Sequence, residues 1–149
     1  MGSVYDHARL FQKKYPSTVS WWRIKKHAQV IEMHLNPNEK VLYAFIGQKN
    51  DLFYDVFSTC VVALTNKRIL IGQKRVVFGY FLSSITPDLF NDLEVYQGLI
   101  WGKITIDTIK EVVAISNLSK KSLPEIETNI TEYMMEEKKK YGKTSKEEK

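Results

Sequence analysis

Three residues near the C-terminus carry the end of a phosphate-binding pattern: Gly142, Lys143 and Thr144. In that pattern, backbone N–H groups and the lysine hold the phosphates of a nucleotide. It requires a further glycine five residues before Gly142, but Glu137 stands there, and no strand precedes the segment. The sequence therefore predicts no nucleotide site.

The three histidines could serve as metal ligands, because neutral imidazole binds transition metals readily. His27 and His34 lie seven residues apart on roughly the same side of an expected helix. Two helical turns separate them by about 10 Å, which is too far for one small ion to bind both unaided. We expect these two histidines and His7 to face solvent, and we expect no metal and no cofactor.

The motifs of the common hydrolases and metal proteins are missing from the sequence. It contains no Gly-x-Ser-x-Gly elbow, no His-Glu-x-x-His helix, no Cys-x-x-Cys pair and no EF-hand loop. The single cysteine, Cys60, cannot form a disulfide within the chain, and its neighbours indicate a buried position in a strand. We therefore expect a cytoplasmic protein that is not an enzyme.

The strongest candidate for a binding site is one side of a helix expected near residues 18–35, before Pro37. At 100° per residue, apolar and basic side chains gather on this side. We call it the mixed face, and it consists of Trp22, Arg23, Lys26, Val30 and Met33. The opposite side carries an apolar stripe that should meet the core: Trp21, Ile24, Ala28, Ile31 and Leu35. Because exposure of the mixed face would be costly, we expect another group to cover it.

Three kinds of occupant fit the mixed face. One is a helix expected near residues 4–14, which would pack there through Ala8, Phe11 and Tyr15. A second is a partner protein or another copy of the chain, because Trp and Arg are frequent anchors of protein interfaces. The third is an anionic membrane surface, whose headgroup region suits indole rings and extended Lys and Arg side chains. Nucleic acid fits less well, since the face offers few bases among its aromatic rings, and nothing indicates a small-molecule substrate.

The chain of 149 residues has a formal net charge of +5, and the excess of basic residues lies at its start. Residues 1–35 hold six Lys or Arg against two acidic residues, whereas residues 36–118 hold eight of each. This distribution favours the N-terminal helices as the part that would meet an anionic surface. The longest apolar stretch, Val76–Leu82, is far shorter than the roughly 18 residues that span a bilayer.

Between Glu39 and Ile115 the pattern changes to short runs rich in β-branched and aromatic residues. Tight turns at 66–67, at 72–75 and at Gly98 predict that successive strands are antiparallel neighbours. Several runs are apolar at every position, which predicts a curled sheet or partly closed barrel that is covered on both faces. Seven strands are expected, at 41–46, 57–65, 68–71, 76–84, 93–96, 100–106 and 112–115.

A helix is expected after the strands. Ser122 and Glu125 have the spacing of a capping box at its start. Its apolar stripe could close the open end of a barrel, and consists of Leu123, Ile126, Ile130, Tyr133 and Met134. Charged residues dominate beyond this stripe, and we expect a disordered tail over residues 142–149.

This order of elements, with the run LTNKRILI at Leu64–Ile71, resembles the bacterial PH-like domains, in particular the YokE-like family. Three further pieces carry the resemblance: residues 36–41, 85–94 and 98–106. It implies an α+β fold, namely a PH-like seven-stranded antiparallel barrel with a C-terminal capping helix and an N-terminal helical extension. The YokE-like family is associated with Gram-positive bacteria and their prophages.

The residues and the resemblance together predict the organisation and the role of the chain. Residues 1–35 form the N-terminal helical extension, residues 36–141 the PH-like barrel with its helix, and residues 142–149 the tail. We expect a non-enzymatic cytoplasmic scaffold that mediates protein–protein interaction or self-association through the mixed face. The alternative is peripheral binding to anionic membrane surfaces through the basic, Trp-containing N-terminal helices.

Overall fold

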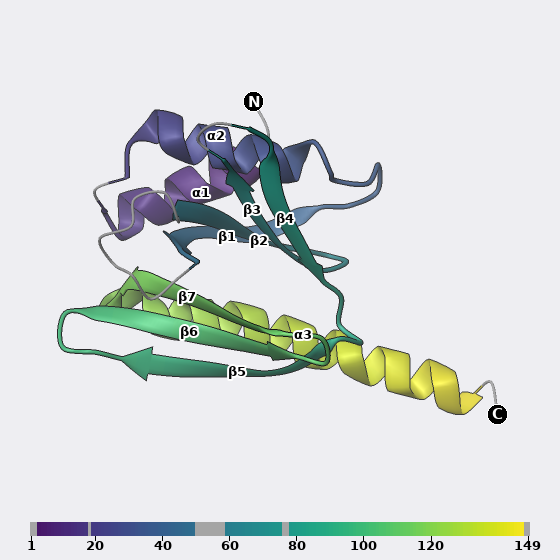
Figure 1. Cartoon of the computed structure of the whole chain (residues 1–149). Helices are drawn as coiled ribbons and strands as arrows, with labels where there is room; N and C mark the ends of the chain where they lie inside the picture. The colour runs from purple at the N-terminus through teal and green to yellow at the C-terminus, as the bar shows by residue number, and fades with distance from the viewer. Residues whose placement is uncertain (1–2, 18, 50–58, 76–77, 148–149) are drawn as a thin grey trace.

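The computed structural model describes residues 3–17, 19–49, 59–75 and 78–147. Within them, two short helices come first, seven strands follow, and a long helix comes last (Figure 1). The elements are α1 (Ser3–Lys14), α2 (Trp21–Glu32), β1 (Val41–Gln48), β2 (Thr59–Thr65), β3 (Ile69–Lys74), β4 (Tyr80–Ile85), β5 (Phe90–Gln97), β6 (Trp101–Thr108), β7 (Val112–Ser119), the short 3-10 helix η2 (Lys120–Ser122) and α3 (Leu123–Glu147).

The strands form one antiparallel sheet in the order β4-β3-β2-β1-β7-β6-β5. Its two halves, β4 to β1 and β7 to β5, meet where β1 pairs with β7 at Gln48 and Ser116. The halves fold over each other at this junction, so the sheet is a curled half-barrel (Figure 1). The predicted architecture of seven antiparallel strands, N-terminal helices and a C-terminal helix is confirmed.

Both faces of the first half-sheet are covered. The helices α1 and α2 lie along one face, and the second half-sheet with α3 lies on the other side (Figure 1). Every residue of β2 is buried as a result, which confirms the expectation drawn from the uniformly apolar runs. All of these layers contribute to the largest fully buried side chains: Phe45, Phe90, Ile24, Ile31, Ile69, Leu70, Ile71, Ile104, Ile106, Ile115, Leu118 and Ile126.

The β3–β4 hairpin differs from the prediction. The sequence predicts a turn at 72–75, but β3 continues to Lys74, and the backbone N–H of Arg75 donates to the carbonyl of Gly79 (3.1 Å). Gly79 has a φ of +72°, a conformation that favours glycine. Gly72 lies beneath α2 instead, where an added Cβ would stand 2.6 Å from Cγ1 of Ile31. Packing of the helix on the strand, and not a turn, therefore requires this glycine.

The start of α3 also differs from the prediction. The Ser122 hydroxyl donates to the carbonyl of Ser119 (2.6 Å). The carboxylate of Glu125 accepts hydrogen bonds from Nζ of Lys14 and from the hydroxyl of Tyr43 (2.9 Å). Glu125 thus joins α3 to α1 and β1 in place of the expected capping bonds.

The described part of α3 is longer than the sequence suggests. Its backbone is helical to Glu147, through most of the segment 142–149 for which the sequence predicts disorder. The division of the chain at residues 35 and 141 stays a prediction.

A buried ion pair joins the residue before β1 to the β2–β3 hairpin. The carboxylate of Glu39 accepts hydrogen bonds from Nε and Nη2 of Arg68, both at 3.0 Å, so the pair is bidentate. The Glu39 side chain is fully buried, and the Arg68 side chain is 18% exposed. The carboxylate also accepts bonds from the Thr65 hydroxyl (2.6 Å) and from the backbone N–H of Asn36 (3.1 Å). Bidentate, charge-assisted bonds of this kind are strong and specific in geometry.

Arg68 extends this arrangement, which we call the Glu39–Arg68 cluster. Its Nη2 also donates to the carbonyl of His34 (2.9 Å), and its Nη1 donates to the hydroxyl of Ser84 on β4 (3.1 Å). Burial raises the pKa of Glu39, but its hydrogen bonds and the charge of Arg68 outweigh burial and hold the pKa below its ordinary value. The cluster explains why Thr and Arg stand in the LTNKR hairpin, since both bind Glu39.

Replacing Arg68 tests the cluster. The variant Arg68→Met should lower the free energy of unfolding by about 3–5 kcal/mol, because it leaves the buried charge of Glu39 without its partner. Urea denaturation followed by tryptophan fluorescence measures this loss. The double variant Glu39→Gln/Arg68→Met should lose less than Arg68→Met alone, since it buries no unpaired charge.

The control is Lys67→Met, which changes an exposed residue of the same hairpin and should shift the free energy of unfolding by less than about 0.5 kcal/mol. Equal losses in Arg68→Met and in the double variant would contradict a role for the buried charge.

Candidate functional site

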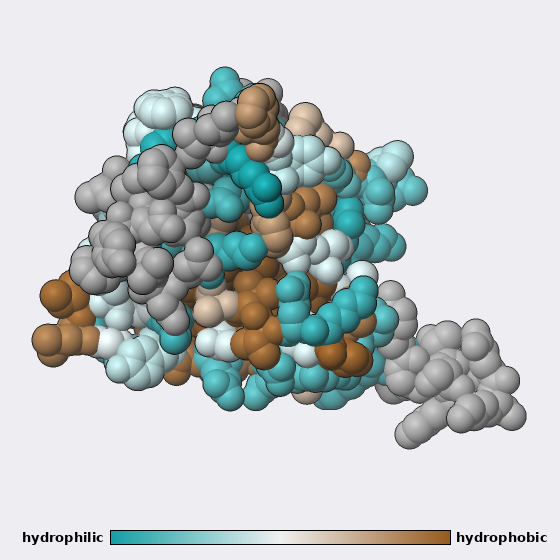
Figure 2. Space-filling model, viewed as in Figure 1, coloured by the Kyte–Doolittle hydropathy of each residue, from teal (hydrophilic) through white to brown (hydrophobic). Residues whose placement is uncertain are grey.

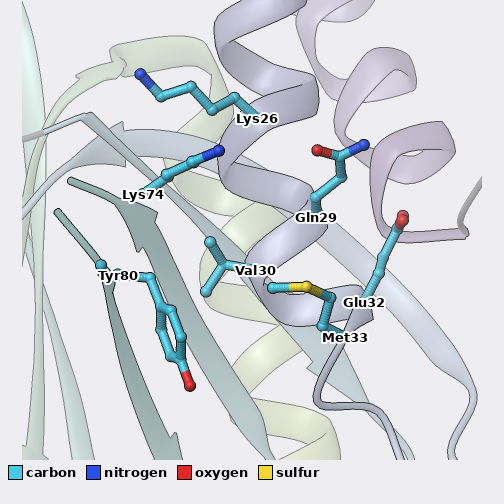
Figure 3. A pocket seen from close by; sticks show the side chains of 8 residues that line it. Lys26, Gln29, Val30, Glu32, Met33, Lys74 and Tyr80 are labelled. Carbon is cyan, nitrogen blue, oxygen red and sulfur yellow. The ribbon is translucent and has the colours of Figure 1, made fainter. Parts of the chain in front are cut away.

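A groove lies between α2 and the β3–β4 hairpin, and we call it the α2 groove. Its volume is about 600 Å³. Figure 3 shows side chains of α2 on one side of it and side chains of the hairpin on the other. The lining residues from α2 and the residue after it are Lys26, Gln29, Val30, Glu32 and Met33, and those from the hairpin are Lys74, Gly79 and Tyr80.

Helical spacing forms the α2 wall of the groove. Lys26, Val30 and Met33 follow one another at intervals of four and three residues, so they share one side of the helix. Val30 is buried between the walls, whereas Met33 is 68% exposed. The α2 wall therefore offers an apolar surface next to an ammonium group.

His27 fixes α2 against β3 beside the groove. The residue is only 5% exposed, and its Nδ1 accepts a hydrogen bond from the backbone N–H of Lys74 (2.9 Å). The prediction of a solvent-facing histidine is wrong here, because the ring is needed as the partner of a backbone group. Burial, followed by the charges of Lys26 and Arg23, lowers the pKa of His27 to about 4. The ring is therefore neutral at pH 7.

His34 holds the opposite wall in place. Its Nδ1 lies 2.6 Å from the carbonyl of Val30, and because a carbonyl can only accept, Nδ1 carries the proton. Its Nε2 lies 3.0 Å from the hydroxyl of Tyr80, and the two ring centroids are 5.0 Å apart. In the neutral ring, Nε2 accepts the bond from Tyr80 and so ties β4 to the end of α2.

The charges of the groove are unevenly placed. Lys26 and Lys74 extend from the two walls at the same end of the groove (Figure 3). Neither amine forms an ion pair with another residue in the part of the chain that the structure describes. Glu32, the acidic residue of the lining, accepts a bond from the backbone N–H of Tyr5 in α1 (3.0 Å), and the two lysines outnumber its one negative charge. The groove therefore presents positive charge beside the apolar surfaces of its walls.

Three of the five predicted site residues, Lys26, Val30 and Met33, line the groove. Trp22 lies one turn before Lys26, is 66% exposed, and has its ring centroid 5.7 Å from Nζ of Lys26. Arg23 points to β2 instead, where its Nη2 donates to Oγ1 of Thr59 (2.7 Å). A binding role for these five residues stays a prediction.

The helix α1 does not cover the mixed face. Phe11 packs against Tyr43 and Phe45 of β1, with ring centroids 6.3 and 6.0 Å apart. The helix therefore lies beside α2 on the sheet, while Trp22 and Met33 remain exposed. The hypothesis that the first helix occupies the mixed face is wrong, because its aromatic ring is used to cover the sheet.

The apolar stripe on the opposite side of α2 is confirmed in part. Ile24, Ala28 and Ile31 are fully buried. Trp21 is 45% exposed, with the guanidinium carbon of Arg9 5.5 Å from its ring centroid, so the expectation that it meets the core is wrong.

Sequence reasoning missed the hairpin wall of the groove. The sequence pattern places Lys74 in a turn, because it follows Gly72. No pattern along the sequence indicates that Tyr80 lies next to α2. The one usable signal was Gly72 itself, because a glycine inside a strand often marks the close approach of another segment.

The described residues hold neither a metal site nor a membrane-spanning helix. No three His, Cys, Asp or Glu side chains among them are grouped as a metal ion would need. No described helix combines the length and the apolar character needed to cross a bilayer.

Comparisons with known proteins identify relatives of this fold. Residues 35–132 match the family described as Bacterial PH domain. The structure is similar to a pleckstrin homology domain from Shewanella amazonensis, with a TM-score of 0.52, 14% sequence identity, and coverage of 72% of this chain and 84% of that one. A protein with a pleckstrin-homology domain from Shewanella loihica gives a TM-score of 0.47 and 15% identity, with coverage of 74% and 89%. The comparison with curated proteins gave no match.

The buried His27 predicts a pH-dependent stability. Its pKa is about 4 in the folded chain against an ordinary value of 6.5, so the unfolded chain binds the proton more readily. Its contribution is therefore fully present above pH 6.5 and is lost as the pH falls toward 4. Over that interval the loss should reach about 3 kcal/mol, and urea denaturation at several pH values measures it.

The comparison variant is His27→Asn, whose side-chain oxygen can accept the bond from Lys74 without titrating. It should lose less stability than the wild type as the pH falls. His7→Asn, a change at a histidine bonded only locally to the Ser3 carbonyl, should keep the wild-type profile. The same profile in wild type and His27→Asn would exclude His27 as the titrating group.

Proposed function

We propose that this chain, which belongs to the bacterial PH domain family, is a non-enzymatic binding module that holds a segment of a protein partner in the α2 groove. Members of the family are generally binding modules and not catalysts. The observation that carries the proposal is the pair Lys26 and Lys74, which extend from opposite walls beside the exposed side chains of Met33 and Tyr80.

The chemistry of the groove specifies the partner. An acidic side chain would form charge-assisted hydrogen bonds with Lys26 and Lys74. An apolar side chain next to it would contact Met33 and Tyr80 and remove their exposed surfaces from water. We therefore infer a partner segment that carries an acidic residue next to an apolar one.

A second copy of the chain fits this groove less well. The net charge of +5 makes two copies repel each other. The far end of α3 projects beyond the half-barrel (Figure 1), but residues 136–147 hold five lysines against three glutamates and would bring a net positive charge to the groove. Charge thus favours a different, acidic protein over self-association.

Peripheral binding to anionic membranes through the N-terminal helices is the second candidate. The exposure of Trp22 (66%) and Trp21 (45%) supports it, because indole rings favour the headgroup region. Internal contacts engage part of the basic charge there, since Lys14 is paired with the carboxylate of Glu125 and the Arg23 side chain is directed to the hydroxyl of Thr59. These contacts favour the protein partner over the membrane for this part of the chain.

Two finer assignments belong to the same proposal. The buried, unpaired Cys60 supports a cytoplasmic setting, where thiols stay reduced. The LTNKR hairpin supports a place in the YokE-like branch of the family and, with it, an origin in prophages.

The double variant Lys26→Glu/Lys74→Glu tests the groove. A random peptide library selected on the wild-type chain should yield peptides with an acidic residue next to an apolar one. Because charge reversal replaces attraction by repulsion, the double variant should bind these peptides at least about tenfold more weakly. Isothermal titration with the selected peptides measures the affinity.

The matched control is Lys110→Glu, an exposed lysine in the β6–β7 turn, which should bind the peptides as the wild type does. Trp22→Ala reports whether the mixed face contributes beyond the groove. Sedimentation velocity on the wild type detects self-association. Failure of the selection to yield a shared acidic and apolar motif, or unchanged affinity in the double variant, would refute the proposal.

A further inference from the structure

The turn of the β5–β6 hairpin carries large apolar side chains in water. The backbone N–H of Gly98 donates to the carbonyl of Trp101 (3.0 Å) and closes the turn. Leu99 is 91% exposed and Ile100 is 69% exposed, while Tyr96 and Trp101 on the flanking strands are 64% and 47% exposed. Figure 2 shows a hydrophobic projection at this end of the molecule. We call these four apolar residues the β5–β6 tip.

This exposure is a feature that needs an explanation. Turn residues in water are usually Gly, Pro, Asn, Asp or Ser. Scattered single apolar side chains on a surface are ordinary, but a contiguous group of four marks a site of contact with another apolar phase. The strands below the turn do not need these side chains for the core, which is formed by inward residues such as Leu93, Ile104 and Ile106.

The charges next to the β5–β6 tip are all of one sign. Trp101 pairs with Ser119 at the end of β7, and η2 begins at the next residue. Across residues 95–104 and 117–122, the charged residues are three lysines: Lys103, Lys120 and Lys121. These two segments hold no acidic residue, and Lys120 and Lys121, which follow the strand partner of Trp101, place positive charge beside the β5–β6 tip.

The connection between α1 and α2 lies at the same end of the molecule. Ser17 and Val19 of this connection line a small cavity together with Trp101. Trp21 and Trp22 follow at the start of α2, and both are exposed. A second, distant part of the sequence therefore lies next to Trp101 of the β5–β6 tip, and two exposed tryptophans follow it in the sequence.

We infer that the β5–β6 tip inserts into the surface of an anionic bilayer. Leu99 and Ile100 enter the acyl region, and Tyr96 and Trp101 lie at the level of the headgroups, where amphipathic rings are stable. Lys120 and Lys121 meet the lipid phosphates. A projecting apolar turn beside lysines matches a soft, negatively charged surface, whereas a folded partner would have to offer a preformed acidic pocket.

The inference does not depend on the α2 groove, which lies on the other half of the sheet. It also differs from membrane binding through the N-terminal helices, because the inserted element is a β-turn that begins more than sixty residues after the end of α2.

Co-sedimentation of the full chain with vesicles tests the insertion. Vesicles of phosphatidylcholine with phosphatidylglycerol should bind the wild type at low salt, and vesicles of phosphatidylcholine alone should bind it far less. The double variant Leu99→Ser/Ile100→Ser should lower the partition coefficient at least about tenfold, since two apolar side chains no longer leave water. Lys120→Glu/Lys121→Glu should lower it by a similar factor and weaken its dependence on salt.

Matched controls lie in the β6–β7 turn. Ile109 is 67% exposed, close to the value for Ile100, and Lys110 follows it. The variants Ile109→Ser and Lys110→Glu should bind vesicles as the wild type does. Circular dichroism checks that each variant keeps its fold.

Four results would overturn the inference. The first would be that the wild type fails to bind anionic vesicles even at low salt. The second would be that the Leu99→Ser/Ile100→Ser variant binds them as well as the wild type. The third would be that Trp22→Ala abolishes binding while the β5–β6 tip variants retain it, because this would assign the contact to the N-terminal helices. The fourth would be that sedimentation velocity reveals a dimer of the wild type, that the Leu99→Ser/Ile100→Ser variant is monomeric, and that the wild type does not bind vesicles. The β5–β6 tip would then contact a second copy of the chain.

Discussion

The carboxylate of Glu39 has no access to water, so its charge must be compensated inside the protein, and Arg68 is the residue that compensates it. This requirement brings together segments that are far apart in the sequence, because Arg68 also bonds to the residue two positions after α2 and to Ser84 on β4. The two walls of the α2 groove are built on those same elements. A polar interaction outside the lining of the groove therefore ties together the elements that form its walls.

Two histidines form further hydrogen bonds between the helix and strand walls of the α2 groove. His27 accepts a bond from the backbone of β3, and His34 links a carbonyl of α2 to a hydroxyl of β4. Each ring connects a helix, or the residues just after it, to a strand, and the ring of His27 does so in its neutral form. Among the described residues, these framework hydrogen bonds use the backbone of Lys74 and the rings of His27 and His34, and they do not use the amines of Lys26 and Lys74. Such a separation of framework and recognition groups is typical of preorganised binding sites.

Local patterns in the sequence were sufficient for the elements of the fold and insufficient for their contacts. The strands could be predicted because β-branched runs and short turns report on the backbone locally, and uniformly apolar runs report on two covered faces. The role of Gly72 could not be predicted, because a glycine looks the same whether a turn or a helix above it demands its small size. His27 was misplaced for a similar reason: its partner is a backbone group 47 residues away. Of the mixed face, the helical period gave Lys26, Val30 and Met33, but the hairpin wall with Tyr80 depends on the tertiary packing of α2 on the sheet.

The junction between the two half-sheets has a mechanical consequence. Within the described residues, β1 and β7 are joined by a single paired position, Gln48 with Ser116, whereas every other pair of neighbouring strands shares a longer ladder. The halves are therefore held together mainly by side chains, through one core cluster that includes Phe45 and Ile106 and through Glu125, which joins α3 to α1 and β1. Substitutions that loosen this side-chain packing would therefore part the sheet at the β1–β7 junction before they open any of its longer ladders.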